Sequence, residues 1–144
     1  MATRTARTVW SGSLSEGSGE VTLASSGVGT FPVSFPKRAA DDADSTTSPE
    51  ELIAAALASC YAMQFSGLMG QAGGTPTSLE VTAEVDFGPD PDGGFHIPGI
   101  RLTVRGTVPG IDDAEFRRVA EETKTTCPVS KALRVPITLD AASA

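Results

Sequence analysis

The sequence is poor in the residues that most often carry enzyme chemistry. Its 144 residues include two cysteines, one histidine, one tryptophan and one tyrosine. A zinc site needs several Cys, His or carboxylate ligands at characteristic spacings, and the single histidine, His96, lies 36 residues after Cys60 and 31 before Cys127. The 66 residues between the cysteines exclude a Cys-x-x-Cys motif of the thioredoxin type. We therefore expect no metal site and no cofactor.

Positive charge and long apolar runs are also scarce. Eleven Lys and Arg against eighteen Asp and Glu give a net charge of -7, which at long range repels phosphate backbones and anionic lipid headgroups. No run of 18 apolar residues occurs, and the N-terminal sequence MATRTARTVWSGS has no apolar segment before a small-residue cleavage site. These absences predict a cytoplasmic protein that binds neither nucleic acid nor membranes.

The composition is otherwise that of an ordinary globular protein. Hydrophobic residues make up 40% of the chain and charged residues 20%, which argues against a disordered or coiled-coil protein. At this length a folded chain buries roughly 68 to 70% of its unfolded surface. We expect a single domain over residues 1–144.

The first third of the sequence predicts short strands followed by a loop. Runs typical of β-strands at 8–10, 20–23 and 30–35 are separated by Ser/Gly clusters, which indicates an antiparallel meander. From Arg38 to Thr47 the sequence is polar and acidic without periodicity. We expect a surface loop there that leads to the first helix.

The clearest predicted element is a long helix that begins with the sequence SPEE. Ser48 suits the N-cap and Pro49 the first helical position, and Glu51 would complete a capping box by returning to the Ser48 amide. The helix should run to about Met69, and because it is apolar almost all round, we expect it to be buried on several sides. Small residues recur along it as a stripe at Ala54, Ala58 and Ala62.

The rest of the chain predicts three more strands and two more helices. Alternating apolar residues at 78–87 and 97–108 indicate a hairpin, and 112–124 has the pattern of an amphipathic helix. A second helix should restart at Pro128, and 135–139 should form a last strand. This order has no regular βαβ alternation, so we predict an α+β fold.

The two cysteines differ in their predicted surroundings. Cys60 falls in the middle of the long helix, where a cysteine is most simply a small apolar core residue. Cys127 precedes Pro128 at the N-cap of a short helix, where free amides favour a thiolate. From position alone, both could still be structural residues without redox chemistry.

Four segments of the sequence resemble the OsmC/Ohr family, named for osmotically inducible protein C and organic hydroperoxide resistance protein. They are SPEELIAAALASCYAM at 48–63, TPTSLEVTAEV at 75–85, VPGID at 108–112 and TCPVS at 126–130. The resemblance implies an OsmC-like fold with antiparallel sheets, a long buried central helix and an intertwined homodimer. It also implies a thiol peroxidase that reduces organic hydroperoxides, with Cys60 as the peroxidatic and Cys127 as the resolving cysteine. A dithiol, of the lipoyl type by resemblance, would be the reductant.

The family also has an arginine and a glutamate beside the reactive sulfur. By resemblance, Glu50 matches the first glutamate of the Pro-Glu motif, and Arg38 matches the arginine that the OsmC branch carries on its third strand, before the loop. The Ohr branch has its arginine nearer the start, where this chain has GSGEVTLASSG without an arginine, which favours the OsmC branch. Lys37 stays open as an alternative to Arg38.

An arginine–glutamate pair beside the sulfur would increase the fraction of cysteine present as thiolate. A thiol with a pKa of ~8.5 is only about 3% thiolate at pH 7, and burial lowers that fraction further. A guanidinium held by a carboxylate would favour the anion that attacks a peroxide. The resulting sulfenic acid would condense with Cys127 before over-oxidation.

Other functions remain open at this stage. A non-catalytic dimeric stress or binding protein with a redox-labile disulfide would carry the same two cysteines. A hydrolase using Cys60 with His96 as its base is disfavoured, because His96 follows the glycines of DGGFHIPG and should lie at a strand end on the surface.

Helix geometry adds one expectation about assembly. Glu50 and Cys60 are ten positions apart in one predicted helix, which means about 15 Å of rise. We therefore expect Glu50 and Cys60 of one site to come from different chains of a two-fold dimer, with the Ala54 stripe allowing an antiparallel helix contact.

Overall fold

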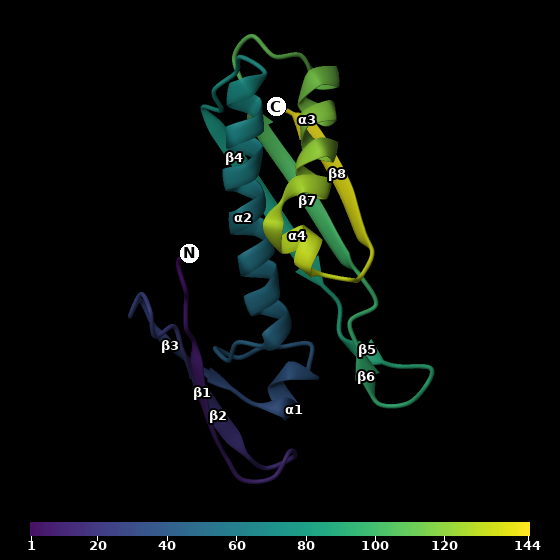
Figure 1. The fold of residues 1–144 in the computed structure, drawn as a ribbon. Coiled ribbons are helices and arrows are strands. Elements are labelled where there is room, and N and C mark those ends of the chain that lie inside the picture. Colours follow the sequence, from purple (N-terminus) through teal and green to yellow (C-terminus); the bar gives the residue numbers. More distant parts are fainter. The chain divides into compact units, whose positions relative to one another are not determined.

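The computed structural model describes residues 1–144, and the chain divides into two compact units, Met1–Leu52 and Ile53–Ala144. Figure 1 shows the elements of each unit. The expectation of one domain over the whole chain stays a prediction.

The first unit is built on a small antiparallel sheet. Its strands are β1 (Arg7–Ser11), β2 (Ser18–Thr22) and β3 (Thr30–Val33), hydrogen-bonded in the order β1-β2-β3. Both pairs are antiparallel, so the predicted meander is confirmed. Trp10 on β1 and Phe31 on β3 are 42% and 37% exposed, so this sheet is only partly covered within the chain.

A short helix, α1 (Phe35–Arg38), follows the third strand and corrects two predictions. The sequence predicts a third strand that reaches Phe35 and a loop that begins at Arg38. Instead, the Ser34 hydroxyl accepts a hydrogen bond from the Lys37 amide at 3.3 Å, and Pro36 suits the first turn because it has no amide to satisfy. Arg38 therefore lies on a helical turn.

The long helix α2 (Pro49–Gln71) begins as predicted and ends two residues later than predicted. The Ser48 hydroxyl accepts a hydrogen bond from the Glu51 amide at 3.1 Å, which confirms the N-cap. The prediction that the Glu51 carboxylate binds the Ser48 amide is wrong, because this carboxylate accepts a hydrogen bond from the Thr47 hydroxyl instead. At the other end, Gly73 has a φ of 87° that a residue with a side chain rarely adopts.

The second unit contains a three-stranded sheet in the order β4 (Ser78–Val85), β7 (Ile100–Thr107), β8 (Ile137–Ser143). Strands β4 and β7 are antiparallel, as expected. A tiny hairpin, β5 (Gly88–Pro89) and β6 (Phe95–His96), occupies the connection between them.

The expectation of purely antiparallel sheets is wrong for the last strand. Strand β8 runs parallel to β7. Between them the chain crosses over through α3 (Asp113–Thr126) and α4 (Pro128–Ala132), and a parallel pair requires such a crossover. The predicted helix restart at Pro128 is confirmed.

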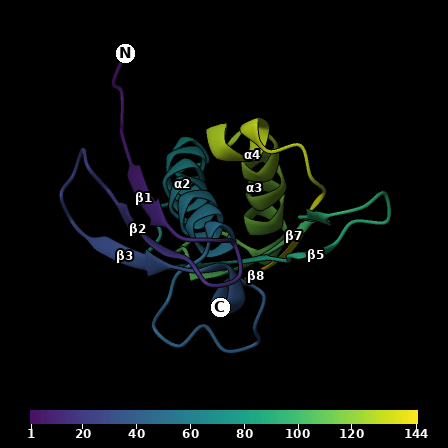
Figure 2. The same ribbon diagram turned by 90° about the horizontal axis from the view of Figure 1, so that it is seen from below.

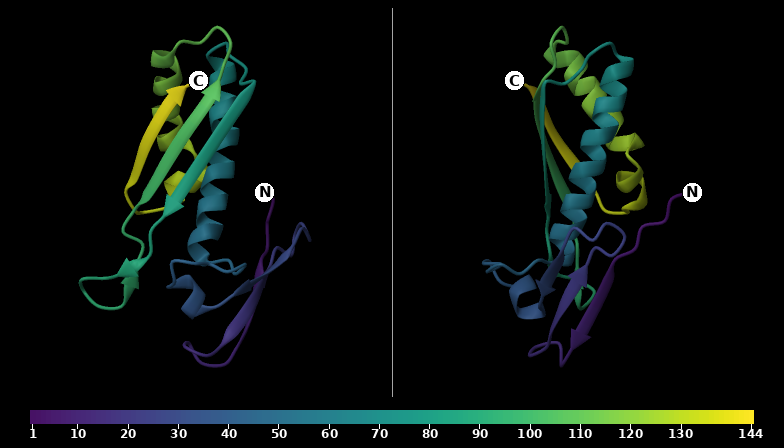
Figure 3. Two further views of the ribbon diagram at one scale, coloured as in Figure 1. Left: turned by 180° about the vertical axis from the view of Figure 1, so that it is seen from behind. Right: turned by 90° about the vertical axis from the view of Figure 1, so that its left-hand side faces the viewer.

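Helices α2 and α3 lie side by side on one face of this sheet, as Figure 2 and the right-hand view of Figure 3 show. The other face carries no helix of this unit, and charged residues such as Glu84 and Arg101 alternate along it. The core lies between the helices and the sheet. Its fully buried side chains include Tyr61, Phe65, Leu102, Val104, Phe116 and Val119.

Only one side of α2 is buried within the chain, so the prediction of burial on several sides is wrong for a single copy. Residues four positions apart face the core: Leu57, Tyr61, Phe65 and Met69. The opposite side is exposed and consists mostly of small residues: Ala55, Ala56, Ser59, Met63, Ser66, Gly67 and Gly70. The predicted stripe of Ala54, Ala58 and Ala62 is half-buried.

By length and composition alone, α2 is apolar enough to cross a membrane, with a mean hydropathy of 1.5 over an 18-residue window of which 22% is buried. A single helix of this kind is weak evidence, because core helices of soluble proteins have the same length and composition.

Candidate active site

The fold of the second unit brings the two cysteines together. Cys60 lies in the middle of α2, and Cys127 is the N-cap of α4. Their sulfur atoms are 3.2 Å apart although the residues are 67 positions apart in the sequence. Helix α3 ends at Thr126 and Pro128 starts the next helix, so the sharp turn between two helices points Cys127 back toward α2.

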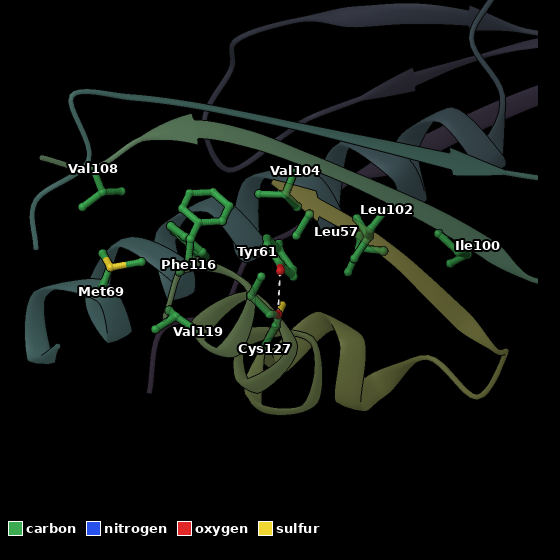
Figure 4. Packing of buried hydrophobic residues seen from close by; sticks show 13 residues of the cluster. Leu57, Tyr61, Met69, Ile100, Leu102, Val104, Val108, Phe116, Val119 and Cys127 are labelled. Carbon is green, nitrogen blue, oxygen red and sulfur yellow. Dashed lines mark hydrogen bonds between the residues drawn. The ribbon is translucent and has the colours of Figure 1, made fainter. Parts of the chain in front are cut away.

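The two thiols differ in exposure. Cys127 is fully buried among core residues such as Tyr61, Phe116 and Val119, as Figure 4 shows. Cys60 is half-buried. A reagent that enters from solvent therefore meets the Cys60 sulfur first.

The surroundings within the chain also separate the two thiols in acidity. Burial raises the pKa of Cys60 most strongly; the Val129 backbone acts to lower it, and the neighbouring Cys127 raises it further. Burial also acts to raise the pKa of Cys127, but the backbone of Ser130, the Cys60 thiol, the Ser130 hydroxyl and the Val129 backbone together lower it. Within one chain these directions make Cys127 the more acidic thiol, whereas the sequence predicts the attacking thiolate at Cys60.

The first unit holds an ion pair between Arg38 and Glu50. The Arg38 guanidinium donates from Nε to Glu50 Oε2 at 3.0 Å and from Nη2 to Oε1 at 2.6 Å, in the bidentate geometry that fixes both groups. Glu50 is only 6% exposed. Lys37 instead pairs with Asp44 at 2.9 Å, so the structure joins Arg38, and not Lys37, to the predicted glutamate.

An apolar pocket of about 420 Å³ lies beside this ion pair, within the first unit, and Arg38 forms part of its wall. Its other lining residues are mostly apolar and include Trp10, Leu14, Val21, Val33, Phe35 and Leu52. Trp10 and Leu14 were not predicted as site residues, because Trp10 belongs to a short strand pattern at 8–10 and Leu14 is a single apolar residue in a Ser/Gly-rich stretch, and neither pattern indicates a pocket.

The remaining candidate, His96, lies away from this chemistry in the small β5-β6 hairpin. Its Nδ1 faces the Asp90 carboxylate at 3.3 Å. A histidine oriented by a carboxylate in a surface hairpin has no contact with either cysteine, which removes the basis for a Cys60–His96 hydrolase.

Fold and cysteine pair together define the class: an α+β protein with two adjacent thiols, one half-exposed and one buried. The family model described as OsmC-like protein matches residues 41–141. The chain is also 40% identical over 131 residues to the peroxiredoxin OsmC of Escherichia coli (strain K12), which covers 91% of this chain and 90% of the relative. The chain therefore belongs to the OsmC family.

Further relatives come from the Ohr side of the family. An organic hydroperoxide resistance protein of Xanthomonas axonopodis pv. citri is 34% identical over 89 residues, or 61% of this chain and 60% of that protein. The crystal structure of an organic hydroperoxide resistance protein from Elizabethkingia anophelis has a TM-score of 0.79 at 27% identity and covers 100% of this chain and 98% of that one. OhrB of Bacillus subtilis has a TM-score of 0.72 at 26% identity, covering 97% and 98%.

Proposed function

We propose that this protein is a thiol-dependent peroxidase that reduces organic hydroperoxides to alcohols. The observation that carries the proposal is the 3.2 Å separation of the Cys60 and Cys127 sulfurs. The names of its relatives, peroxiredoxin and organic hydroperoxide resistance protein, support a peroxide-related redox role.

In this proposal Cys60 is the peroxidatic cysteine, because it is the more accessible thiol. Its thiolate attacks the distal peroxide oxygen, the O–O bond breaks, and the hydroxyl group stays on the sulfur. The alkoxide leaves and takes up a proton from solvent to become the alcohol. Cys60 becomes a sulfenic acid. Cys127 then attacks the oxidised sulfur, water leaves, and a disulfide forms after the sulfurs approach by about 1.2 Å to the usual bond length of about 2.05 Å.

The Arg38–Glu50 pair supplies the missing positive charge at Cys60. Since burial and Cys127 raise the pKa of Cys60, its thiolate is scarce at neutral pH without help. Lowering a thiol pKa by about 2.5 units requires roughly 3.4 kcal/mol of preferential thiolate stabilisation, which a close guanidinium in a dry site can provide. Glu50 holds the plane of the guanidinium and so fixes its orientation toward the sulfur and the peroxide.

We further propose that the pair reaches Cys60 from a second copy of the chain. Glu50 and Cys60 belong to one continuous helix, and ten helical residues correspond to about 15 Å. Within a two-fold dimer, an antiparallel contact of α2 with its symmetry mate would bring the start of each helix alongside the middle of the other. The exposed small residues of α2 support this contact: Ala55, Ser59 and Gly67 allow two backbones to approach closely.

The catalytic cycle closes when a dithiol reduces the Cys60–Cys127 disulfide. We propose a lipoyl-type dithiol as reductant and the cytoplasm as the compartment, where a disulfide is more often transient and catalytic than structural. No metal or cofactor takes part in this scheme.

Steady-state peroxide consumption tests the proposed function. Hydrogen peroxide, cumene hydroperoxide and a lipid hydroperoxide are each supplied with a lipoyl dithiol or with reduced thioredoxin. We expect consumption of the organic hydroperoxides with the lipoyl dithiol, and none in a matched Cys60→Ser control. A protein that forms the disulfide once and never turns over with any reductant would instead be a non-catalytic protein with a redox-labile disulfide.

A further inference from the structure

One buried polar atom in the structure has no hydrogen-bond partner, and it lies beside the resolving cysteine. It is the side-chain oxygen of Ser130, whose residue is 8% exposed. A buried hydroxyl without a partner is costly, so such an atom in a native protein calls for a functional explanation.

The position of Ser130 on α4 places its side chain near Cys127. Cys127 is the N-cap of this helix and Ser130 is its third residue, two positions on one turn that exchange side-chain-to-backbone hydrogen bonds in a capping box. The first turn is closed by the Lys131 amide, which donates to the Cys127 carbonyl at 3.0 Å. The Cys127 side chain itself makes no capping hydrogen bond. The Cys127 sulfur donates to the Cys60 sulfur at 3.2 Å, whereas the Ser130 hydroxyl on the same turn has no hydrogen-bond partner.

We propose that Ser130 is a positioning residue for the resolving sulfur: its hydroxyl donates a hydrogen bond to the Cys127 thiolate when the disulfide is reduced. The inference rests on the proposed function, since it assigns a task within that cycle. In the dithiol state the hydroxyl lacks an anion to bind, which accounts for its missing partner.

The difference in exposure decides which sulfur needs this help. A thiolate of the reducing dithiol attacks Cys60, because Cys127 is fully buried. The new S–S bond joins the reductant to Cys60, the Cys60–Cys127 bond breaks, and its electron pair stays on Cys127. The second thiol of the reductant then displaces Cys60 and leaves as a cyclic disulfide. Cys127 is the leaving group of the first step, and a leaving thiol of lower pKa departs faster.

The other groups around Cys127 do not compete with Ser130 for this task. The titratable groups that face Cys127 are Cys60 and Tyr61, both on α2. The Tyr61 hydroxyl already donates to the Ala120 carbonyl at 2.6 Å, and burial holds its pKa well above the usual value. The Ser130 hydroxyl, together with its own amide, also lowers the pKa of Cys127.

The first test measures the Cys127 thiolate without any catalysis. In a Cys60→Ser background, the thiolate absorbance near 240 nm is titrated against pH, with and without Ser130→Ala. We expect the pKa of Cys127 to be about one unit higher without the hydroxyl, and Ser130→Thr, which retains a hydroxyl, to keep it low. Equal pKa values with and without the Ser130→Ala substitution would overturn the inference.

The second test measures the step itself. The oxidised protein is reduced with dithiothreitol under pseudo-first-order conditions, and Ser130→Ala should slow the first step about threefold if the rate depends on the leaving thiol with a coefficient near 0.5. A single-turnover oxidation of Cys60 by cumene hydroperoxide should be unchanged, as should both rates in a control with the exposed Ser18→Ala. An unchanged reduction rate contradicts the role of Ser130 and leaves the peroxidase intact. If the unsubstituted protein consumes no peroxide, the proposed function fails, but the thiolate titration still decides what Ser130 does.

Discussion

Cys60 and Cys127 lie with their sulfurs 3.2 Å apart in surroundings that make them chemically unequal. Cys127 is fully buried and has a lowered pKa, whereas Cys60 is partly accessible and has a raised one. Within one chain, accessibility therefore favours Cys60 as the attacking residue, and acidity favours Cys127. The attacking sulfur of a peroxidase must be both accessible and ionised. The cation that the proposed dimer would bring to Cys60 is central to the mechanism for this reason.

The first prediction concerns the division of labour between the cysteines. Cys60→Ser should abolish hydroperoxide reduction, because it removes the attacking sulfur. Cys127→Ser should permit one turnover and then become sensitive to over-oxidation, because no resolving thiol intercepts the sulfenic acid. Mass spectrometry of each variant after a hydroperoxide pulse measures the modification at each position.

The opposite pattern would reverse the roles. Sulfinate that accumulates on Cys127 in the Cys60→Ser variant, with none on Cys60 in the Cys127→Ser variant, would make Cys127 the peroxidatic residue. The lowered pKa of Cys127 favours a thiolate at that position, so the experiment distinguishes two chemically reasonable assignments of the peroxidatic cysteine.

The second prediction separates Arg38 from its neighbour Lys37. Arg38→Ala should raise the kinetic pKa of Cys60, and a rise of about two units lowers the thiolate fraction about a hundredfold at pH 6. Arg38→Lys should rescue poorly, because an ammonium cannot form the two parallel hydrogen bonds to Glu50. Lys37→Ala is the matched control, since Lys37 pairs with Asp44 instead. The pH dependence of peroxide consumption measures all three, and full activity of Arg38→Ala at pH 6 would exclude the arginine from the site.

Several helices and strands could be predicted from local sequence signals. Ser48 and Pro49 fix the start of α2, because a hydroxyl cap and a residue without an amide both satisfy a helix N-terminus. The same logic located α4 at Pro128. Alternating apolar residues located β4 and β7, since one face of each strand is buried.

Other features depend on contacts that no local pattern encodes. The parallel pairing of β8 with β7 results from the path of the crossover between them. Helix α1 has only four residues, too few for a periodic pattern to distinguish it from a continued strand. The Arg38–Glu50 pair came from family resemblance, because the two residues are twelve positions apart and a loop of unknown course lies between them. Ser130 could have been found from the Cys-x-x-Ser spacing, which places it on the first turn of a predicted helix that has Cys127 as its N-cap.

The third prediction concerns stability at low pH. Asp113 accepts hydrogen bonds from Arg117, from the Ser143 amide at 2.8 Å and from the Ser143 hydroxyl at 2.9 Å, which together link α3 to β8. These contacts, Arg117 foremost, lower its pKa from 3.8 to about 2. Because the folded pKa is the lower one, the contribution to stability is fully present above pH 3.8 and is lost as the pH falls toward 2.

Asp113→Asn should therefore unfold at a lower urea concentration than the unsubstituted protein at pH 7, and the difference should disappear near pH 2. Asp41→Asn, at an exposed carboxylate without an ion pair, is the control and should show no such difference. A gap between the unsubstituted protein and the Asp113→Asn variant that is constant from pH 7 to 2 would mean that charge at this position does not matter.

The last prediction concerns the assembly of the site from two chains. If Glu50 of one chain serves Cys60 of the other, each homodimer of Glu50→Ala retains the sulfur without its partner, and each homodimer of Cys60→Ser retains the partner without the sulfur. Mixing the two variants then gives heterodimers in which one of the two sites has both residues intact. We expect activity to return after subunit exchange, to about half that of the unsubstituted dimer per heterodimer.

Exchange itself has to be measured separately, by native mass spectrometry of chains that differ in isotopic mass. A mixture of Glu50→Ala with Glu50→Ala/Cys60→Ser is the matched control, because it exchanges equally and restores no complete site. Heterodimers that form and yet stay inactive would contradict the proposal that each site is assembled from two chains. That result would require either a break in α2 between Glu50 and Cys60 or a role for Glu50 away from the sulfur, because about 15 Å of continuous helix separates those two residues.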